Sequence, residues 1–318
     1  MSMKPAQDSP HCLLCDGSLA AILQNVADSR FGIPKAYAIG KCTDCQLVQL
    51  YPCPSSYELK QLYEDHYNFG GGHRGFYSKL RSAFLNSILY RVWMSMDGDI
   101  SFHKRRGKGR LLDVGCNEGR GLPMYRRNGF EVEGLELNER AAAEARKEGF
   151  AIHTELLESH QPDALYDVVV LSNVLEHALQ PDEMLIHVAR LLKPGGEVWI
   201  SCPNVCSWQS ARFEKYWINW HVPFHIVHFS RATLMDLLKN MGFEPLESRN
   251  ISPALWTAQS LIARVFFRCG QPTIQLRNPL LVAFLMLLIR LLFFPALWLG
   301  NLVQRGDCLI VIARKNLN

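Results

Sequence analysis

RLLDVGCNEG, residues 110–119, is the stretch that decides the expected fold of this 318-residue chain. Its apolar start predicts a strand, and Gly115 and Gly119 predict the turn that follows. A helix is expected from about residue 122, because Pro123 suits a first helical turn. A strand, a glycine turn and a helix in this order are typical of the nucleotide-binding edge of an open parallel sheet.

The polar residues around this turn indicate the charge of the ligand. The glycine spacing differs from the G-x-G-x-x-G pattern that holds a pyrophosphate, and Asp113 beside the turn favours a cation over a phosphate. Glu136, about 20 residues downstream, is placed to accept the hydroxyls of a ribose. S-adenosylmethionine (SAM) combines an ammonium, a sulfonium and a ribose diol, so it fits both carboxylates. The alternative is an ordinary turn that binds no ligand.

The rest of the chain predicts an α/β fold, a doubly wound and mostly parallel Rossmann-like sheet of seven strands. Strands are expected at residues 110–114, 131–136, 150–153, 167–171, 196–201, 244–250 and 307–313. Helices are expected near residues 122–128, 139–148, 181–192 and 231–241, with another from residue 55 to 67 and an amphipathic one from 76 to 96. The last strand should lie antiparallel to the strand at 244–250.

Three motifs in this order resemble those of class I SAM-dependent methyltransferases: LDVGCNEG, YDVVVLSNVLEH (residues 166–177) and LLKPGGEVWISCPN (residues 191–204). Asn117 stands where that family usually has Gly, and Asn tolerates a positive φ better than most residues. The resemblance covers about residues 105–250. It implies a cofactor site made of Asp113, Gly115, Cys116, Asn117, Gly119, Glu136, Leu137, Glu155 and Asn173, in which Glu155 would hold the adenine amino group.

Two CxxC pairs, Cys12 with Cys15 and Cys42 with Cys45, precede this core. Four thiolates in this arrangement predict a closed, structural zinc site; four reduced cysteines without metal are the alternative. The second pair begins CTDCQLVQLYP, which resembles the N-terminal zinc-binding segment of bacterial methyltransferases that act on sugars and cell-surface glycans. A small zinc-binding module at the N-terminus is therefore expected.

Histidines supply the candidate catalytic groups. Transfer of a methyl group to oxygen or carbon needs a base, for which we expect His177 first, then His225 and His228. A structural role is the alternative for each of them. WHVPFHIVHFS, residues 220–230, resembles a segment of glycan-associated family members. In some relatives, including quinone-ring O-methyltransferases, an acid–histidine pair and a later histidine bind a divalent ion, which Glu176, His177 and His225 would do here.

Residues 253–306 interrupt the α/β pattern with two apolar helical stretches. Residues 279–303 are long enough to cross a bilayer. A single crossing, however, would separate the last strand from its own sheet. We therefore expect a helical hairpin that lies on a membrane, dips into it or packs against a second subunit, with Trp256 and Trp298 suited to an interface.

These features divide the chain into four expected parts: 1–54, a Cys-rich zinc module; 55–106, a helical linker or lid; 107–252 with 307–318, the SAM-binding core; and 253–306, the apolar insertion. The glycines at 70–72 predict either a mobile lid or a joint, and the basic run at 103–108 predicts a solvated linker. The net charge of +4 is too small to predict a nucleic-acid partner. The polar N-terminus predicts a cytoplasmic protein, peripheral on the inner face of the membrane if the insertion meets lipid.

The resemblance leaves three functional hypotheses. The first is a SAM-dependent methyltransferase for a sugar or a lipid-linked cell-envelope or secondary-metabolite precursor. The second is an O-methyltransferase for a lipophilic, quinone-type small molecule. The third is a non-catalytic zinc and membrane scaffold with a degenerate SAM fold, and the presence of Asp113 and Glu136 argues against it.

Overall fold

A computed structural model of the chain describes residues 10–66, 84 and 87–317. Seven strands form one sheet in the order β10-β11-β8-β7-β4-β5-β6. Neighbouring strands are parallel except that β11 is antiparallel to both β8 and β10. The strands are β4 (Gly109–Val114), β5 (Phe130–Leu135), β6 (Ala151–His153), β7 (Tyr166–Ser172), β8 (Leu192–Pro203), β10 (Phe243–Ile251) and β11 (Cys308–Lys315). The predicted fold class and the antiparallel last strand are confirmed.

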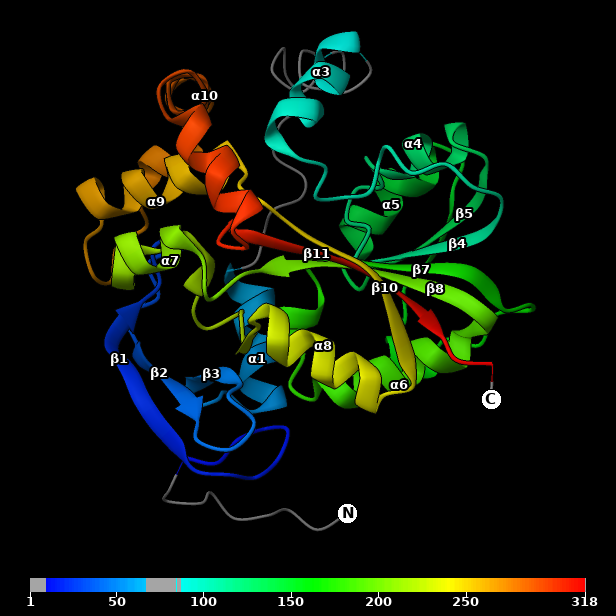
Figure 1. Ribbon diagram of the computed structural model, residues 1–318, viewed down its shortest axis with the longest axis horizontal. Helices are drawn as coiled ribbons and strands as arrows, with labels where there is room; N and C mark the ends of the chain where they lie inside the picture. The colour runs from blue at the N-terminus through cyan, green and yellow to red at the C-terminus, as the bar shows by residue number, and fades with distance from the viewer. Residues whose placement is uncertain (1–9, 67–83, 85–86, 318) are drawn as a thin grey trace.

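Helices cover both faces of this sheet (Figure 1). α4 (Leu122–Arg127) and α5 (Glu139–Lys147) lie on one face, and α6 (Pro181–Leu191) and α8 (Arg231–Asn240) lie on the other. Side-chain caps fix where helices begin: Asn138 accepts from the first N–H groups of α5, and Ser230 and Thr233 form a reciprocal capping box at α8. The four helices predicted in this part of the chain are therefore present.

β8 begins earlier than expected. It starts at Leu192, and its register with β7 shifts between the pairs Tyr166–Leu192 and Val168–Glu197. Between these pairs one residue of β7, Asp167, thus lies opposite four of β8, because the Pro-Gly-Gly turn forms a bulge with Gly195 at φ +75°. The turn is present, but it interrupts a strand instead of preceding one.

A second, antiparallel sheet joins the N-terminal part to the core. Its order is β1-β2-β3-β9, with β1 (Leu19–Ala27), β2 (Ala36–Cys42), β3 (Val48–Tyr51) and β9 (Val227–His228). α1 (Ser56–His66) follows β3 in the chain. β9 comes from the histidine-rich segment after β8, and its Val227 and His228 pair with Gln49 and Val48. One apolar core therefore runs from the cysteine-rich segment into the large sheet.

The insertion before β11 is a helical hairpin, as predicted. α9 (Ala254–Phe266) and α10 (Pro279–Leu302) are joined through a 3₁₀ turn at Ile274–Arg277. α3 (Ile88–Asp97) packs beside them, and its Asp97 accepts a hydrogen bond of 2.6 Å from Arg290 of α10. Further short helices are α7 (Trp208–Phe213) and 3₁₀ turns at Leu157–Ser159, Leu175–His177, Glu214–Tyr216 and Ile218–Trp220. The glycines at 70–72 and residues 76–83, 85 and 86 of the helix predicted at 76–96 lie outside the described residues, and α3 covers the end of that helix.

Candidate active site

A cavity of about 570 Å³ opens at the carboxyl ends of β4 and β7. Five of the predicted cofactor residues line it: Asp113, Gly115, Cys116, Asn117 and Asn173. The other four, Gly119, Glu136, Leu137 and Glu155, lie outside its lining. The sequence analysis missed the other lining residues, which are Tyr90, Ser101, His103, Glu118, Arg120, Gly121, Met124, Tyr125 and Ser172. Parallel sheets place ligands at this edge, so the position agrees with the expected cofactor site.

His103 corrects the prediction that residues 103–108 form a solvated linker. Asp99 accepts hydrogen bonds from the N–H groups of His103 and Lys104, which fold this segment back onto the core. The His103 ring lies against Tyr125, and burial lowers its pKa. The basic composition of the run suggested that all of its side chains face water. Only some of them do, so the contact of His103 with the core was not predicted.

Two carboxylates that are not paired with a basic side chain among the described residues mark one end of the cavity, Asp113 in its wall and Glu136 just outside its lining. Asp113 is buried at the end of β4, and that burial together with the nearby charge of Glu136 raises its pKa to about 7. Glu136 accepts hydrogen bonds from the N–H groups of Asn117 (2.9 Å) and Asn138 (2.8 Å), which hold its carboxylate at the glycine turn. A buried carboxylate with a raised pKa is stabilised by an approaching cation, so this end of the cavity suits a positively charged ligand.

The turn itself depends on backbone conformations with positive φ. Gly115, Asn117 and Gly119 have φ of +70°, +52° and +70°. Asn117 therefore adopts the conformation for which Asn was expected to be tolerated. A Cβ on Gly119 would come within 2.6 Å of the Cβ of Ala145 on α5. Gly119 thus allows close packing of the turn on α5, and its predicted contact with the cofactor stays a prediction.

Replacing Gly119 with Ala should lower the stability of the domain by about 1–3 kcal/mol, because the side chain would both strain the backbone and overlap Ala145. Gly149→Ala is the matched control, since Gly149 has φ +79° and a Cβ added there would meet nothing within 4 Å. Urea unfolding of both variants measures the difference. Equal losses in the two variants would show that the contact with α5 is unimportant.

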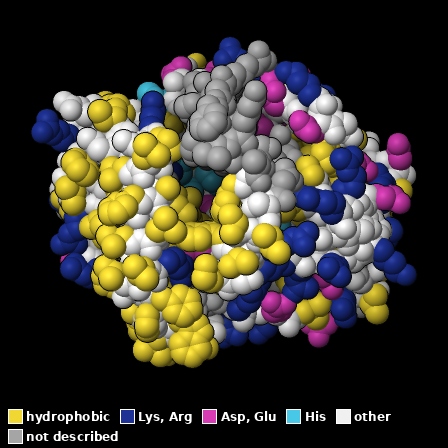
Figure 2. Space-filling model, turned by 90° about the horizontal axis from the view of Figure 1, so that it is seen from above, with side chains coloured by type: hydrophobic (Ala, Val, Ile, Leu, Met, Phe, Trp, Pro, Cys, Tyr) yellow, Lys and Arg dark blue, Asp and Glu magenta, His cyan; other side chains and the backbone are white. Residues whose placement is uncertain are grey.

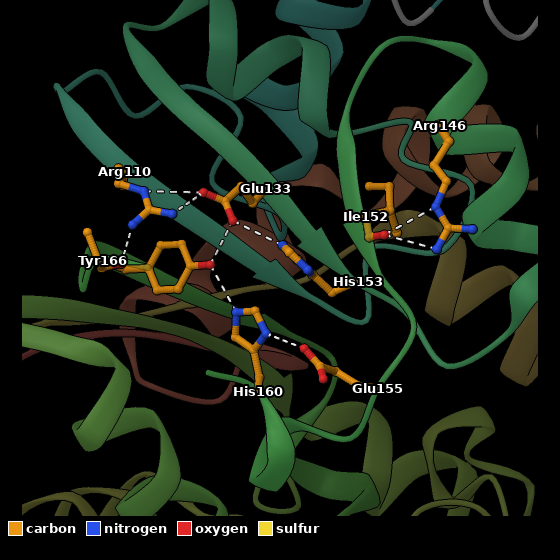
Figure 3. Close-up of polar contacts among 9 residues, drawn as sticks. Arg110, Glu133, Arg146, Ile152, His153, Glu155, His160 and Tyr166 are labelled. Carbon is orange, nitrogen blue, oxygen red and sulfur yellow. Dashed lines mark hydrogen bonds and ion pairs between the residues drawn. The ribbon is translucent and has the colours of Figure 1, made fainter. Parts of the chain in front are cut away.

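Glu155 belongs to a polar network at the ends of β5 and β6 (Figure 3). Its carboxylate lies 2.7 Å from Nδ1 of His160, whose Nε2 lies 3.0 Å from the Tyr166 hydroxyl. The Tyr166 hydroxyl donates to Glu133 at 2.9 Å, and Arg110 pairs with the same carboxylate. Glu155 is thus held from one side by His160. Its predicted contact with adenine stays a prediction.

The segment after β7 brings Glu176, His177 and His225 together. One ligand atom from each lies within 4.8 Å of the others. Burial raises the pKa of Glu176 to about 8, and neither carboxylate oxygen has a hydrogen-bond partner among the described residues. Burial lowers the pKa of His177 to about 4 and that of His225 well below its usual range. Both imidazoles are therefore neutral near pH 7.

Hydrogen bonds orient the two rings of this group. The Nδ1–H of His225 donates to the carbonyl of Asn219 at 2.8 Å, which leaves Nε2 as a lone-pair donor. The Tyr63 hydroxyl lies 2.8 Å from Nδ1 of His177. The rings of His177 and His225 meet edge to face, with centroids 4.7 Å apart. The cluster is next to the cavity along the chain, because Asn173 lines the cavity three residues before Glu176.

His228, the third predicted catalytic histidine, is not part of the cluster of Glu176, His177 and His225. It belongs to β9, is 1% exposed and packs against Trp220 with ring centroids 4.8 Å apart. Burial lowers its pKa to about 3, and neither ring nitrogen has a partner among the described residues. This position favours packing between the two sheets over proton transfer for His228.

The four predicted metal-binding cysteines lie together. Their sulfur atoms are all within 4.8 Å of one another, with Cys12 to Cys45 and Cys15 to Cys42 each at 3.4 Å. These separations are too long for disulfides and match the sulfur spacing around a tetrahedral zinc ion. The Asp44 N–H donates to the Cys42 sulfur. Burial raises the pKa of Cys42, yet backbone hydrogen bonds from Asp44 and Cys45 outweigh it and lower that pKa to about 7.

The sequence of the central part of the chain matches a known protein family. Residues 97–248 match the family model of a methyltransferase domain. This segment is a class I SAM-dependent methyltransferase domain. The predicted resemblance is confirmed for this segment, whereas the association of the chain with glycans or the cell envelope stays a prediction.

Several curated proteins resemble the methyltransferase domain. A probable S-adenosylmethionine-dependent methyltransferase of Mycolicibacterium smegmatis is 33% identical over 137 residues, which cover 42% of this chain and 51% of that protein. A ubiquinone biosynthesis O-methyltransferase of Pectobacterium carotovorum is 35% identical over 156 residues, covering 45% and 64%. The chain thus spans about half of the first relative and less than two thirds of the second.

Among solved structures, the 1,6-didemethyltoxoflavin-N1-methyltransferase of Burkholderia thailandensis is similar to this chain with a TM-score of 0.47. Its identity is 16%, and the match covers 88% of this chain and 96% of that one.

Proposed function

We propose that this chain transfers the methyl group of SAM to an oxygen or carbon atom of a lipophilic or lipid-linked small molecule. The buried carboxylate of Asp113 carries this proposal, because it stands in the wall of the cavity of a methyltransferase domain and favours a cationic ligand. Methyl transfer needs the acceptor in line with the departing thioether, so alignment is the main task of the protein. The exposed apolar hairpin supports a lipophilic acceptor.

Glu176, His177 and His225 are the groups that would receive the acceptor proton. A carboxyl with a pKa of about 8 and two neutral imidazoles supply lone pairs in a buried setting. His177 is the preferred base, since Tyr63 orients its ring and it follows directly from the segment that lines the cavity. The lowered pKa of His177 makes it a weak base in the free protein, and a negative charge on Glu176 would raise that pKa.

The same three residues fit a divalent cation. The unpartnered carboxylate of Glu176 and the two neutral imidazoles form a donor set that such ions accept, and Asn219 orients His225 as outer partners of metal-bound histidines do. When bound, the ion would polarise an acceptor hydroxyl. Metal analysis finding one zinc per chain, with turnover unchanged after removal of Mg²⁺, would exclude this second metal.

Two classes of molecule are candidates for the methyl acceptor. Sugars and lipid-linked sugars agree with the resemblance of the cysteine-rich segment to glycan-associated methyltransferases. Quinols agree with the names of several relatives, which are ubiquinone biosynthesis O-methyltransferases. Assays of S-adenosylhomocysteine release with nucleotide sugars, lipid-linked sugars and quinols separate the two. Binding of SAM without turnover on any acceptor would favour the non-catalytic scaffold.

Glu176→Gln should reduce kcat by about 10²-fold once an acceptor is found, because the variant keeps the shape of the side chain but can neither ionise nor take up a proton. SAM affinity should change little, since Glu176 does not line the cavity. Glu183→Gln on α6 is the control for a surface carboxylate. An unchanged kcat for Glu176→Gln would remove this cluster from the reaction, and an equal loss of SAM affinity would indicate a folding defect.

A further inference from the structure

α10 presents a long apolar surface to solvent. Only 17% of its most apolar 18-residue window is buried, and the helix is long and apolar enough to cross a membrane. Leu280 and Leu291 are 80% and 79% exposed. They belong to one stripe with helical spacing, which consists of Leu280, Phe284, Leu287, Leu291, Phe294 and Trp298. Figure 2 shows hydrophobic side chains gathered over this side of the molecule.

The other side of α10 is attached to the protein along its length. Ile289 and Leu297 are buried with Ala254 and Ala258 of α9. Near its end, Gly300 packs so closely on Trp208 that a Cβ would lie 3.1 Å from that ring. β11 then enters the large sheet at Cys308, between β10 and β8. A helix held in this way can lie in the plane of a membrane surface but cannot cross it without leaving the fold.

The charged residues of the inserted segment itself have one sign. Residues 251–306 contain no Asp or Glu but five arginines. Arg290 is buried and paired with Asp97. The other four, Arg264, Arg268, Arg277 and Arg305, are exposed, and none of them pairs with a carboxylate among the described residues. A second copy of this surface would bring like charges together, whereas an anionic lipid surface would neutralise them.

α3 connects this surface to the cavity. Its Trp93 packs against the apolar cluster between α9 and α10, while Ile88, Leu89 and Val92 are exposed. Tyr90 of the same helix lines the cavity. Figure 1 places α3 beside α10 on the same side of the molecule. Lipid in contact with this surface would thus lie near the proposed active site.

We infer that α10, with the exposed arginines around it, binds in the plane of a membrane surface that carries anionic lipid headgroups. The apolar stripe inserts among the acyl chains next to the headgroups, and the four exposed arginines contact the negative charges. This inference deepens the proposed function, because an acceptor dissolved in that membrane would reach the cavity past α3. The binding itself needs no acceptor and no SAM.

The test is co-sedimentation of the full chain with vesicles of phosphatidylcholine alone or mixed equally with phosphatidylglycerol. Wild-type protein should bind the anionic vesicles at least tenfold more tightly, and added salt should weaken the binding. Arg268→Gln with Arg277→Gln should lower affinity about 30-fold, since each arginine near an anionic surface contributes about fivefold. Leu287→Gln with Leu291→Gln should abolish binding.

Two controls and a second measurement keep the outcomes separate. Leu317→Gln matches the exposure of Leu291 at the far end of the chain, and Lys239→Gln removes a charge on α8; neither should change vesicle binding. SAM titration of every variant reports on the cofactor site. Vesicle binding that is absent, equal for both lipids, or replaced by a dimer lost in the leucine variant would overturn the inference. Vesicle binding without SAM binding would instead contradict the proposed function.

Discussion

Asp113→Asn should weaken SAM binding by about 2–5 kcal/mol, between roughly 30-fold and several thousand-fold, because the variant removes a buried charge that faces a cationic ligand. The exchange preserves the shape of the side chain and relieves the repulsion with Glu136, so the protein should fold at least as stably as wild type. Isothermal titration with SAM measures the loss. Glu244→Gln, an exposed carboxylate on β10, controls for a general effect of net charge.

The pH dependence of SAM binding shows whether Asp113 acts through its negative charge or only through the shape of its side chain. The pKa of Asp113 is raised to about 7 in the free protein, and a cationic ligand binds the deprotonated form. Wild-type affinity should therefore fall as the pH drops below 7, by up to about tenfold per pH unit. Asp113→Asn should lose this dependence. A variant with wild-type affinity and the same pH profile would show that Asp113 does not face the cofactor.

Cys15→Ser should remove zinc from the protein and cost several kcal/mol of stability, because metal binding in a closed four-cysteine site contributes directly to folding. The expected result is one zinc ion per wild-type chain, none in the variant, and a large drop in the temperature of thermal unfolding. Elemental analysis and calorimetry measure the two. Cys269→Ser, an exposed cysteine outside the cluster, should change neither.

The effect of zinc loss should extend beyond the N-terminal part. β3 pairs with β9, and Leu50 donates its N–H to the carbonyl of Ile226, next to His225. Unfolding of the small sheet would therefore disturb the histidine cluster as well. Amide hydrogen exchange would detect faster exchange in β9 of the variant. A stable variant without zinc, with unchanged exchange in β9, would contradict the structural role of the metal.

The order of strands and helices in the methyltransferase domain could be predicted from the sequence, because turn and cap residues mark the points where these elements begin. The Gly115 turn, the Asn138 cap and the Ser230 cap each occur where a helix or its preceding turn begins. The antiparallel last strand was expected from the resemblance to the methyltransferase fold. These features depend on residues close together in the chain, where propensity and capping act.

Contacts between distant segments escaped the sequence analysis. No local pattern shows that Val227 and His228 pair with the cysteine-rich sheet, so His228 was placed among the catalytic candidates. Tyr90 and His103 reach the cavity only through the packing of α3 and the bonds to Asp99. The tight contact of Gly119 with Ala145 was not predicted, because it depends on where α5 packs.

The most direct measurement is isothermal titration of the zinc-loaded wild-type protein with SAM and with its demethylated product, S-adenosylhomocysteine. We expect both to bind at one site per chain, with dissociation constants in the micromolar range, and SAM binding to release protons near pH 7 as Asp113 becomes charged. Absence of binding to either compound, in protein that is folded and metal-loaded, would contradict the assignment of the cavity as a SAM site.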